Sequence, residues 1–481
     1  MRTNKKLLSN MIYSGVFQLL FLITPVITIP YVSRIFSPSD LGLYATSYAV
    51  VIFLVQIASF GMPLYGTRAI AQANNKKEQS QLLANLWIIQ ITATFIIFLL
   101  YCLFSYLLIK ERKIYLVQGL LLLTNLFDIS WFYRGIEEIK KTIFRNLISK
   151  IIAILLIYTL VKNETHFVYY IVINIFGVLI GNLSMVFQLR KYIDFSNLKP
   201  KIHYHNIRSS FDLLIPQSIE SGKGMLPKII LVWLGTYKEA GLLDQGLKIT
   251  NILSGIFYSI VNSMIPRLSY LASNKRKDEI EKLVYLFTIV IVIISSMVIS
   301  GTLAISEFFV PLFFGKGYNG VIPIMNIVIF SILFSPFSYF FGQGLLLSFS
   351  QDKKYQRIIA ISGVVLVIFS FLLAKPLGGI GISIAYILSE LIIMIMSLYY
   401  SRRVINMRST ISMLPSTPLL IVINYFITSR LKQFLPVSNN FIGLLIFGGT
   451  SVIISIGLSI IFLKLIKFDF KKIKKTVKNN R

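Results

Sequence analysis

Charged side chains inside long apolar segments are the residues of this sequence best suited to chemistry. The densest group falls in two consecutive segments, 213–235 and 242–265, and consists of Glu220, Lys223, Lys228, Asp244 and Lys248. A charge in hydrocarbon costs at least about 2.5–3.5 kcal/mol on insertion scales, so each one needs a reason to be there. Because lysine and arginine bind phosphate through charged hydrogen bonds, the chemistry that this group offers is the binding of an anion.

The spacing of these residues predicts which of them share a helix face. Glu220 and Lys223 are three residues apart, and Asp244 and Lys248 are four apart, which are the spacings of neighbours on a helix surface. In both pairs an acid lies within one turn of a lysine. We therefore predict a cavity in which acids do not outnumber basic groups, and such a cavity favours an anionic ligand.

Glycine and proline interrupt two of the apolar segments. Segment 213–235 and the N-terminal segment 10–34, which ends in an arginine, carry the following residues: Gly222, Gly224, Pro227, Pro25, Pro30 and Arg34. This composition predicts a bent or broken helix around Lys223. Interrupted spans at matching positions of two halves are a sequence indication of a transport site.

A structural interpretation of the same charges stays open. Lys228 and Lys248 lie within two turns of the predicted outer face, and Lys150 lies toward the inner face, so their long side chains could reach the lipid headgroups. Arg34 and Asp40 could form a structural pair that closes the turn after the first segment. Under this interpretation the charges anchor the helices and bind no ligand.

The segments that must position these residues are long enough to cross a membrane as helices. The chain has 481 residues, of which 55% are apolar and 14% charged, whereas soluble proteins carry about 25% charged residues. The apolar runs do not alternate as spanning strands do, so we predict an all-α integral membrane protein. The fourteen predicted spans are 10–34, 39–60, 82–108, 114–133, 143–161, 167–189, 213–235, 242–265, 283–306, 321–347, 358–375, 378–400, 415–434 and 441–463.

The net charge of +29 follows the predicted topology. Loops on one side of the spans hold 34 of the 48 Lys and Arg residues, and loops on the other side hold ten. Because basic loops stay in the cytoplasm, both termini are predicted to be cytoplasmic. Basic residues placed between spans argue against a nucleic-acid partner. We also expect no cofactor, no metal site and no catalytic residue, since the sequence has no metal-ligand cluster, nucleophile motif or glycine-rich phosphate loop.

A weak internal repeat divides the chain into two halves. With an offset of 199 residues, Gln18 aligns with Gln217, and segment 40–43 aligns with segment 239–242. A repeat of six helices enters the membrane in the same direction both times, which predicts two parallel lobes with a site between them. The predicted domains are an N-lobe at 1–189, a cytoplasmic linker at 190–212, a C-lobe at 213–400, two added helices at 401–463 and a basic cytoplasmic tail at 464–481.

Four segments give the sequence a resemblance to a known family. They are 30–51 (PYVSRIFSPSDLGLYATSYAVV), 60–71 (FGMPLYGTRAIA), 128–146 (DISWFYRGIEEIKKTIFRN) and 239–252 (EAGLLDQGLKITNI). They resemble the polysaccharide flippases (Wzx-type, O-antigen and capsule) of the multidrug/oligosaccharidyl-lipid/polysaccharide exporter superfamily. The resemblance implies a MATE-like fold of two six-helix lobes plus two C-terminal helices, with a cationic central cavity. It also implies export of undecaprenyl-diphosphate oligosaccharides from the cytoplasmic to the outer leaflet.

This resemblance suggests roles for the charged and polar residues. We hypothesise that the diphosphate docks at Lys223 with help from Lys228, Lys248 and Arg34. The polar and acidic side chains expected in the same cavity are Asp40, Glu220, Asp244, Gln18, Gln217, Asn251 and Gln245, whose amides could contact sugar hydroxyls. The expected partners are the undecaprenyl-diphosphate oligosaccharide, membrane lipids and the polysaccharide polymerase machinery.

Two other functions remain as alternatives to a flippase of the bacterial inner membrane. A MATE-like drug or cation exporter would need uncompensated acids in the membrane, but Glu220 and Asp244 each have a lysine within one turn. A membrane polysaccharide polymerase or glycosyltransferase would need a sizeable loop for its catalytic groups, and the longest polar loops have only about 20 residues. The sequence therefore favours a transporter over an enzyme.

Overall fold

The protein is built from helices. The computed structural model describes residues 24–194 and 203–466, and within these ranges every regular element is helical. This confirms the predicted all-α class. The described residues form two compact units, which are described separately below. Unit 1 comprises the chain up to Lys248 together with Phe314–Gly317 and Ile359–Ser389, and unit 2 comprises Ile249–Phe313, Tyr318–Ile358 and the chain from Glu390 onward.

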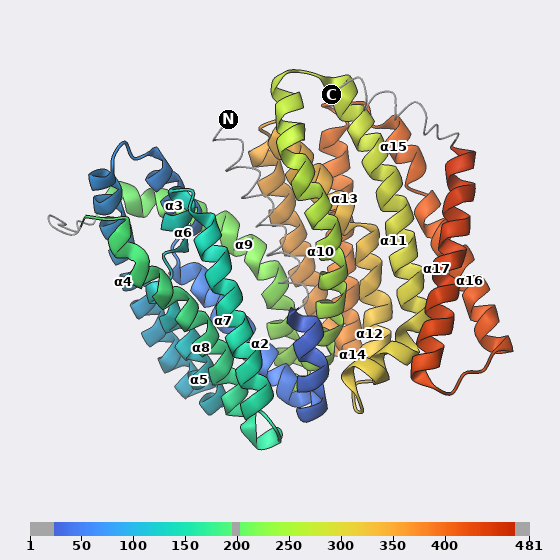
Figure 1. Cartoon of the computed structure of the whole chain (residues 1–481), viewed down its shortest axis with the longest axis horizontal. Coiled ribbons are helices and arrows are strands. Elements are labelled where there is room, and N and C mark those ends of the chain that lie inside the picture. Colours follow the sequence, from blue (N-terminus) through green and yellow to red (C-terminus); the bar gives the residue numbers. More distant parts are fainter. Residues whose placement is uncertain (1–23, 195–202, 467–481) are drawn as a thin grey trace. The chain divides into compact units, whose positions relative to one another are not determined.

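The helices of the first half of the chain belong to unit 1. Residues 24–35 are helical, and this helix is followed by α2 (Pro38–Ala58), α3 (Met62–Gln72), α4 (Lys76–Leu108), α5 (Arg112–Thr124), η1 (Asn125–Phe127), α6 (Ser130–Gly135), α7 (Ile139–Leu160), η2 (Glu164–His166), α8 (Phe167–Gln188), η3 (Leu189–Lys191) and α9 (Tyr204–Leu234). Within this unit α5 packs against α2, α4 and α8, and α7 runs along α8 (Figure 1).

Several of the remaining helices have residues in both units. They are α10 (Tyr237–Ser273), α11 (Lys277–Phe314), α12 (Val321–Val328), η4 (Ile329–Leu333), α13 (Ser335–Tyr339), η5 (Phe340–Leu346), α14 (Asp352–Ser401), α15 (Arg408–Met413), α16 (Ser416–Phe434) and α17 (Asn440–Leu465). Within unit 2, Asn424 on α16 donates hydrogen bonds to Ser451 and Ser455 on α17. The ring of Phe308 on α11 stacks on Phe447 of α17.

Ten of the helical stretches in the described ranges are long and apolar enough to cross a membrane, so the chain is a multi-pass membrane protein. The fourteen predicted spans differ from these ten for three reasons. Most of span 10–34 lies outside the described residues. Spans 143–161 and 213–235 are helical, as parts of α7 and α9, but are not among the ten. Spans 358–375 and 378–400 form one stretch of 50 residues, α14.

Proline and glycine accompany a break in α14 but not in α9. The predicted bent or broken helix around Lys223 is not broken, because α9 is continuous from Tyr204 to Leu234, and the bend stays a prediction. Helices in a membrane tolerate proline when neighbouring groups satisfy the backbone acceptor that it leaves free. The non-helical residue lies instead in α14, at Gly378, with φ 55° and ψ −134°. This φ lies in the left-handed region that glycine adopts at little cost.

The start of α2 is fixed by its own side chains. Ser37 caps the helix by accepting a hydrogen bond from the backbone N–H of Asp40, and the Asp40 carboxylate accepts one in return from the backbone N–H of Ser37 at 3.0 Å. Pro38 occupies the first turn, where its missing N–H is not needed. The sequence Ser-Pro-Ser-Asp therefore determines where α2 begins.

Two glycines bring the first turns of α2 and α10 into backbone contact. A methyl group on Gly42 would lie 1.7 Å from the carbonyl oxygen of Tyr237, and one on Gly241 would lie 1.9 Å from that of Pro38. The contact is reciprocal, since Gly42 and Gly241 are 199 residues apart and so are Pro38 and Tyr237. This offset is that of the predicted repeat, and any side chain at either glycine would push the two helices apart.

One buried glutamine holds the loop between α5 and α6. Gln90 on α4 donates hydrogen bonds to the backbone carbonyls of Asn125, at 2.7 Å, and Asp128, at 2.9 Å. It also accepts a hydrogen bond from the indole N–H of Trp131 at 2.9 Å. These bonds fix the segment that carries Asn125 and Asp128, both of which line the cavity described next.

Candidate substrate site

Three charged residues of unit 1 form a lysine–aspartate cluster, consisting of Lys228, Asp244 and Lys248. The ammonium group of Lys228 on α9 lies 2.5 Å from one carboxylate oxygen of Asp244 on α10, and that of Lys248 lies 2.7 Å from the other. The Asp244 side chain is buried, whereas Lys228 and Lys248 keep 19% and 34% of their side-chain surface exposed. One negative and two positive charges leave a net charge of +1 at this point.

The orientation of the two lysines bears on whether they anchor the helices or face a ligand. Both ammonium groups point at a buried carboxylate of the protein, which favours the cavity interpretation for Lys228 and Lys248 over a reach toward headgroups. A buried charge without a partner is costly, so Asp244 gives both lysines a reason to stay together. Their assignment to substrate binding stays a prediction.

The other predicted cationic residues lie outside this cluster. Lys223 is half-buried on α9, five residues before Lys228, and five residues turn a helix about 140° beyond one full turn. Lys223 and Lys228 therefore leave the helix on different faces. Arg34 is exposed, and its guanidinium donates a hydrogen bond to the carbonyl of Pro30 at 2.5 Å.

The predicted acidic and amide residues are dispersed. Asp40 belongs to the cap of α2, Gln217 accepts a hydrogen bond from Gln56 at 2.8 Å, and Asn251 is exposed in unit 2. Gln245 is buried, and its side-chain oxygen has no hydrogen-bond partner among the described residues. Gln18 and the side chain of Glu220 lie outside what the structure describes.

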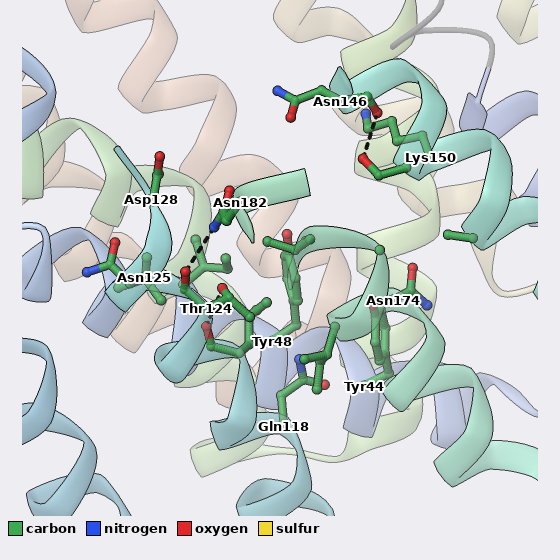
Figure 2. A pocket seen from close by; sticks show the side chains of 18 residues that line it. Tyr44, Tyr48, Gln118, Thr124, Asn125, Asp128, Asn146, Lys150, Asn174 and Asn182 are labelled. Carbon is green, nitrogen blue, oxygen red and sulfur yellow. Dashed lines mark hydrogen bonds between the residues drawn. The ribbon is translucent and has the colours of Figure 1, made fainter. Parts of the chain in front are cut away.

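Unit 1 also contains an amide cavity that the sequence did not indicate. It has a volume of about 400 Å³ and lies between α2, α5, α7 and α8 (Figure 2). Its polar lining consists of Tyr44, Tyr48, Gln118, Thr124, Asn125, Asp128, Asn146, Ser149, Lys150, Asn174 and Asn182. The signal that could have found it is the presence of five asparagine and glutamine side chains on three neighbouring apolar segments.

The amide cavity contains two charged side chains, which are differently engaged. Asp128 accepts a hydrogen bond from the backbone N–H of Ser130 at 2.9 Å, so its carboxylate helps to start α6. Lys150 projects from α7 on the side of the cavity where Asn146 lies, away from Asp128 (Figure 2). The cavity is therefore mostly neutral and rich in amides, with one cation at its edge.

Two tyrosines connect the amide cavity with the lysine–aspartate cluster. Tyr44 and Tyr48 lie one turn apart on α2, with ring centroids 5.7 Å apart, and both line the cavity. Gly42 on α2 is in backbone contact with the start of α10 at Tyr237 and Gly241, so Tyr44 and Asp244 each lie within one turn of this helix crossing. The cluster and the cavity are thus neighbouring parts of one polar region of unit 1. Among the described residues no three His, Cys, Asp or Glu side chains are grouped as metal ligands would be.

Comparison with solved structures places the chain in the class of proteins with a MATE-like fold. The lipid II flippase MurJ, in an inward closed conformation, matches with a TM-score of 0.73 and 15% identity, covering 95% of this chain and 99% of that chain. An inward-facing multidrug resistance MATE family transporter of the MOP superfamily matches with a TM-score of 0.62 and 14% identity, covering 83% of this chain and 96% of that chain. At these identities the matches establish the fold.

The sequence identifies the family within this class. A family model described as "Polysaccharide biosynthesis protein" matches residues 7–272, more than half of the chain, and the chain belongs to that family. A relative from Escherichia coli (strain K12), named as an O-antigen transporter, is 24% identical over 84% of this chain and 98% of its own length. These findings confirm the resemblance to the polysaccharide flippases.

Proposed function

We propose that the protein is a flippase that moves undecaprenyl-diphosphate-linked oligosaccharides from the cytoplasmic to the outer leaflet of the bacterial inner membrane. Family membership and the O-antigen transporter relative support this function. The observation that carries it is the lysine–aspartate cluster, because two lysines directed at one point supply the charged hydrogen-bond donors that a diphosphate needs. The flippase works by alternating access, with both termini in the cytoplasm and two six-helix lobes as its moving parts.

In this proposal the Asp244 carboxylate occupies the place that a phosphate takes during transport. Carboxylate and phosphate oxygens both accept charged hydrogen bonds from ammonium groups. When the diphosphate binds, its oxygens accept hydrogen bonds from the ammonium groups of Lys228 and Lys248 in place of Asp244. When the substrate leaves, Asp244 accepts these hydrogen bonds again. Because the diphosphate must displace the Asp244 carboxylate, its affinity for the lysines stays moderate, and it can be released on the other side of the membrane.

The membrane potential assists this direction of movement. Moving two negative charges outward across about 100 mV releases about 4–5 kcal/mol. Lys223 and Arg34 provide further positive charge on the path of the headgroup. The oligosaccharide is passed on to the polymerase machinery in the outer leaflet.

Complementation of a strain that lacks this gene tests the proposed function. We expect deletion to abolish the surface glycan and to leave lipid-linked repeats on the cytoplasmic leaflet. The double variant Lys228→Gln with Lys248→Gln, at normal protein level, should reduce the restored surface glycan at least about 100-fold, since both charged donors are lost. Lys432→Gln is the matched control, because Lys432 pairs with Glu307 in unit 2, outside the cluster.

Two results would overturn the proposal. One is an unchanged surface glycan after deletion in a strain without a second exporter. The other is full complementation by the double lysine variant, which would remove the lysine–aspartate cluster from the substrate path.

A drug or cation exporter is the second candidate, supported by the fold match to a multidrug MATE transporter. Within the described residues the acid at the cluster, Asp244, is bound to two lysines, so a cation would have to displace both. If this candidate is correct, overproduction should raise resistance to cationic drugs and deletion should leave the surface glycan intact.

A further inference from the structure

We propose that the amide cavity binds the first sugar ring of the glycan, the one bonded to the diphosphate. This inference rests on the proposed function and assigns a second contact to the same substrate. It concerns residues of α2, α5, α7 and α8 in unit 1, none of which belongs to the lysine–aspartate cluster.

The size of the cavity suits one small polar ring. Its volume of about 400 Å³ falls at the small end of the range of about 300–1,000 Å³ that is typical of small-molecule sites. A whole oligosaccharide does not fit in such a space, and a single water molecule leaves most of it empty. A sugar ring with a few ordered waters matches the volume.

The side-chain oxygen of one buried amide in the cavity lacks a hydrogen-bond partner in the described part of the chain. Gln118 on α5 is 1% exposed, lines the cavity, and its side-chain oxygen accepts no hydrogen bond from the described residues (Figure 2). Buried polar groups are rarely left unsatisfied, and those that are call for an explanation. A ligand hydroxyl that donates to this oxygen provides one.

The remaining lining groups suit hydroxyls better than other ligands. Asn182 donates its amide N–H to the carbonyl of Thr124 at 2.9 Å, so its orientation is fixed and its oxygen is left to accept from a ligand (Figure 2). Amides both donate and accept, as sugar hydroxyls do. The rings of Tyr44 and Tyr48 add apolar faces with polar edges, against which the C–H face of a sugar can pack.

Other classes of ligand fit the cavity poorly. The ammonium group of Lys150 repels a metal ion or a cationic drug, and the carboxylate of Asp128 is engaged by the N–H of Ser130. An acyl chain would leave the amide groups without hydrogen bonds, which is costly. A neutral, hydroxyl-rich ligand satisfies the amides and can also accept a hydrogen bond from Lys150.

The position of the cavity matches the chemistry of the substrate. In a lipid-linked glycan the first sugar is bonded directly to the diphosphate, so the sites for these two groups must be neighbours. Tyr44 lines the amide cavity and lies, like Asp244, within one turn of the glycine contact between α2 and α10. A diphosphate at the lysine–aspartate cluster therefore brings its first sugar toward the tyrosine side of the cavity.

Saturation-transfer NMR on the purified full-length protein in nanodiscs tests the inference. The probes are the methyl pyranosides of glucose, galactose, N-acetylglucosamine and N-acetylgalactosamine. We expect at least one of them to bind the unmodified protein and to bind Gln118→Leu and Asn182→Leu about 3- to 10-fold more weakly, the effect of losing one hydrogen bond. Gln433→Leu is the matched control and should bind normally, because Gln433 is exposed on α16 in unit 2.

A parallel measurement distinguishes failure of the sugar site from failure of the proposed function. Binding of sugar-free undecaprenyl diphosphate is measured in parallel and should depend on Lys228 and Lys248 but not on Gln118. Suppose that undecaprenyl diphosphate binds in this way but no pyranoside binds, or that the pyranosides bind equally well to both cavity variants and to the control. The proposed sugar site is then wrong, and the proposed flippase function is unaffected. If Gln118→Leu does not fold, Tyr48→Ala replaces it, since Tyr48 is 39% exposed.

Discussion

The lysine–aspartate cluster and the amide cavity are neighbouring polar parts of unit 1 that satisfy their groups in opposite ways. In the cluster Lys228 and Lys248 each form an ion pair with Asp244. In the cavity the amides are neutral, and the buried side-chain oxygen of Gln118 has no hydrogen-bond partner among the described residues. Under our proposal, the cluster keeps its ion pairs without a ligand, whereas a sugar supplies hydrogen-bond partners in the cavity.

The largest expected effect is the loss of the carboxylate from the cluster. Asp244→Asn leaves two half-buried lysines close together, and we expect it to lower the free energy of unfolding by about 2–4 kcal/mol, toward the lower value because Lys248 is 34% exposed. Thermal unfolding in detergent measures this change. Adding Lys228→Gln to Asp244→Asn should restore part of the stability. A double variant no more stable than Asp244→Asn would contradict the pairing.

A methyl group between α2 and α10 should separate the cluster from the cavity. Gly42→Ala places its methyl group 1.7 Å from the carbonyl of Tyr237, and relief of this overlap should cost about 1–3 kcal/mol of stability. We expect undecaprenyl diphosphate and pyranosides each to bind as before, while complementation falls. Gly449→Ala is the control, because no atom lies within 4 Å of its added methyl group. Full complementation by Gly42→Ala would show that the two parts need not be close.

Removal of the unsatisfied amide should affect function without loss of stability. Gln118→Leu deletes a buried amide whose side-chain oxygen accepts no hydrogen bond from the described residues. The free energy of unfolding should therefore stay constant or rise by up to about 1 kcal/mol. Complementation should nevertheless fall. A loss of stability of several kcal/mol would mean that Gln118 holds the structure together, and the contrast with the cluster would disappear.

The smallest expected effect concerns an ion pair outside both parts. Lys432 lies 3.1 Å from Glu307, whose side chain is 65% exposed, and solvent-exposed ion pairs contribute at most about 1 kcal/mol. Lys432→Gln should therefore shift the melting temperature by no more than a few degrees, and it should leave the amount of surface glycan unchanged. A marked loss of glycan in this variant would mean that positive charge in general, rather than the cluster, supports transport.

The sequence predicted the cluster better than the cavity for a physical reason. A charge in an apolar segment is expensive, so Asp244 and Lys248 stood out, and their spacing predicted the contact that the structure contains. Spacing along the sequence could not decide whether Lys223 or Lys228 on α9 pairs with Asp244, because this depends on which faces of α9 and α10 pack together. Neutral amides such as Gln118 cost less and occur throughout the spans, so the sequence does not single out those that share a cavity.

The path of the backbone was predictable to different degrees. Apolar runs predicted the helices, and the boundary between spans 358–375 and 378–400 coincides with the non-helical Gly378. The chain between Val321 and Leu346 was predicted as one span, but it passes from α-helix through 3-10 helix and back to α-helix before it ends as a π-helix. Such changes of pitch are set by packing against neighbours such as Phe287, which stacks on Phe340, and not by local composition.

The reciprocal glycine contact has an electrostatic consequence. It brings together the amino ends of α2 and α10, and each such end carries about half a positive charge from its aligned peptide dipoles. Asp40 and Glu239, one in the first turn of each helix and 199 residues apart, place a carboxylate at each end and offset this repulsion. The Glu239 carboxylate also lies against Gly378, where the second half of α14 begins, so that one acid offsets the dipoles of two helices.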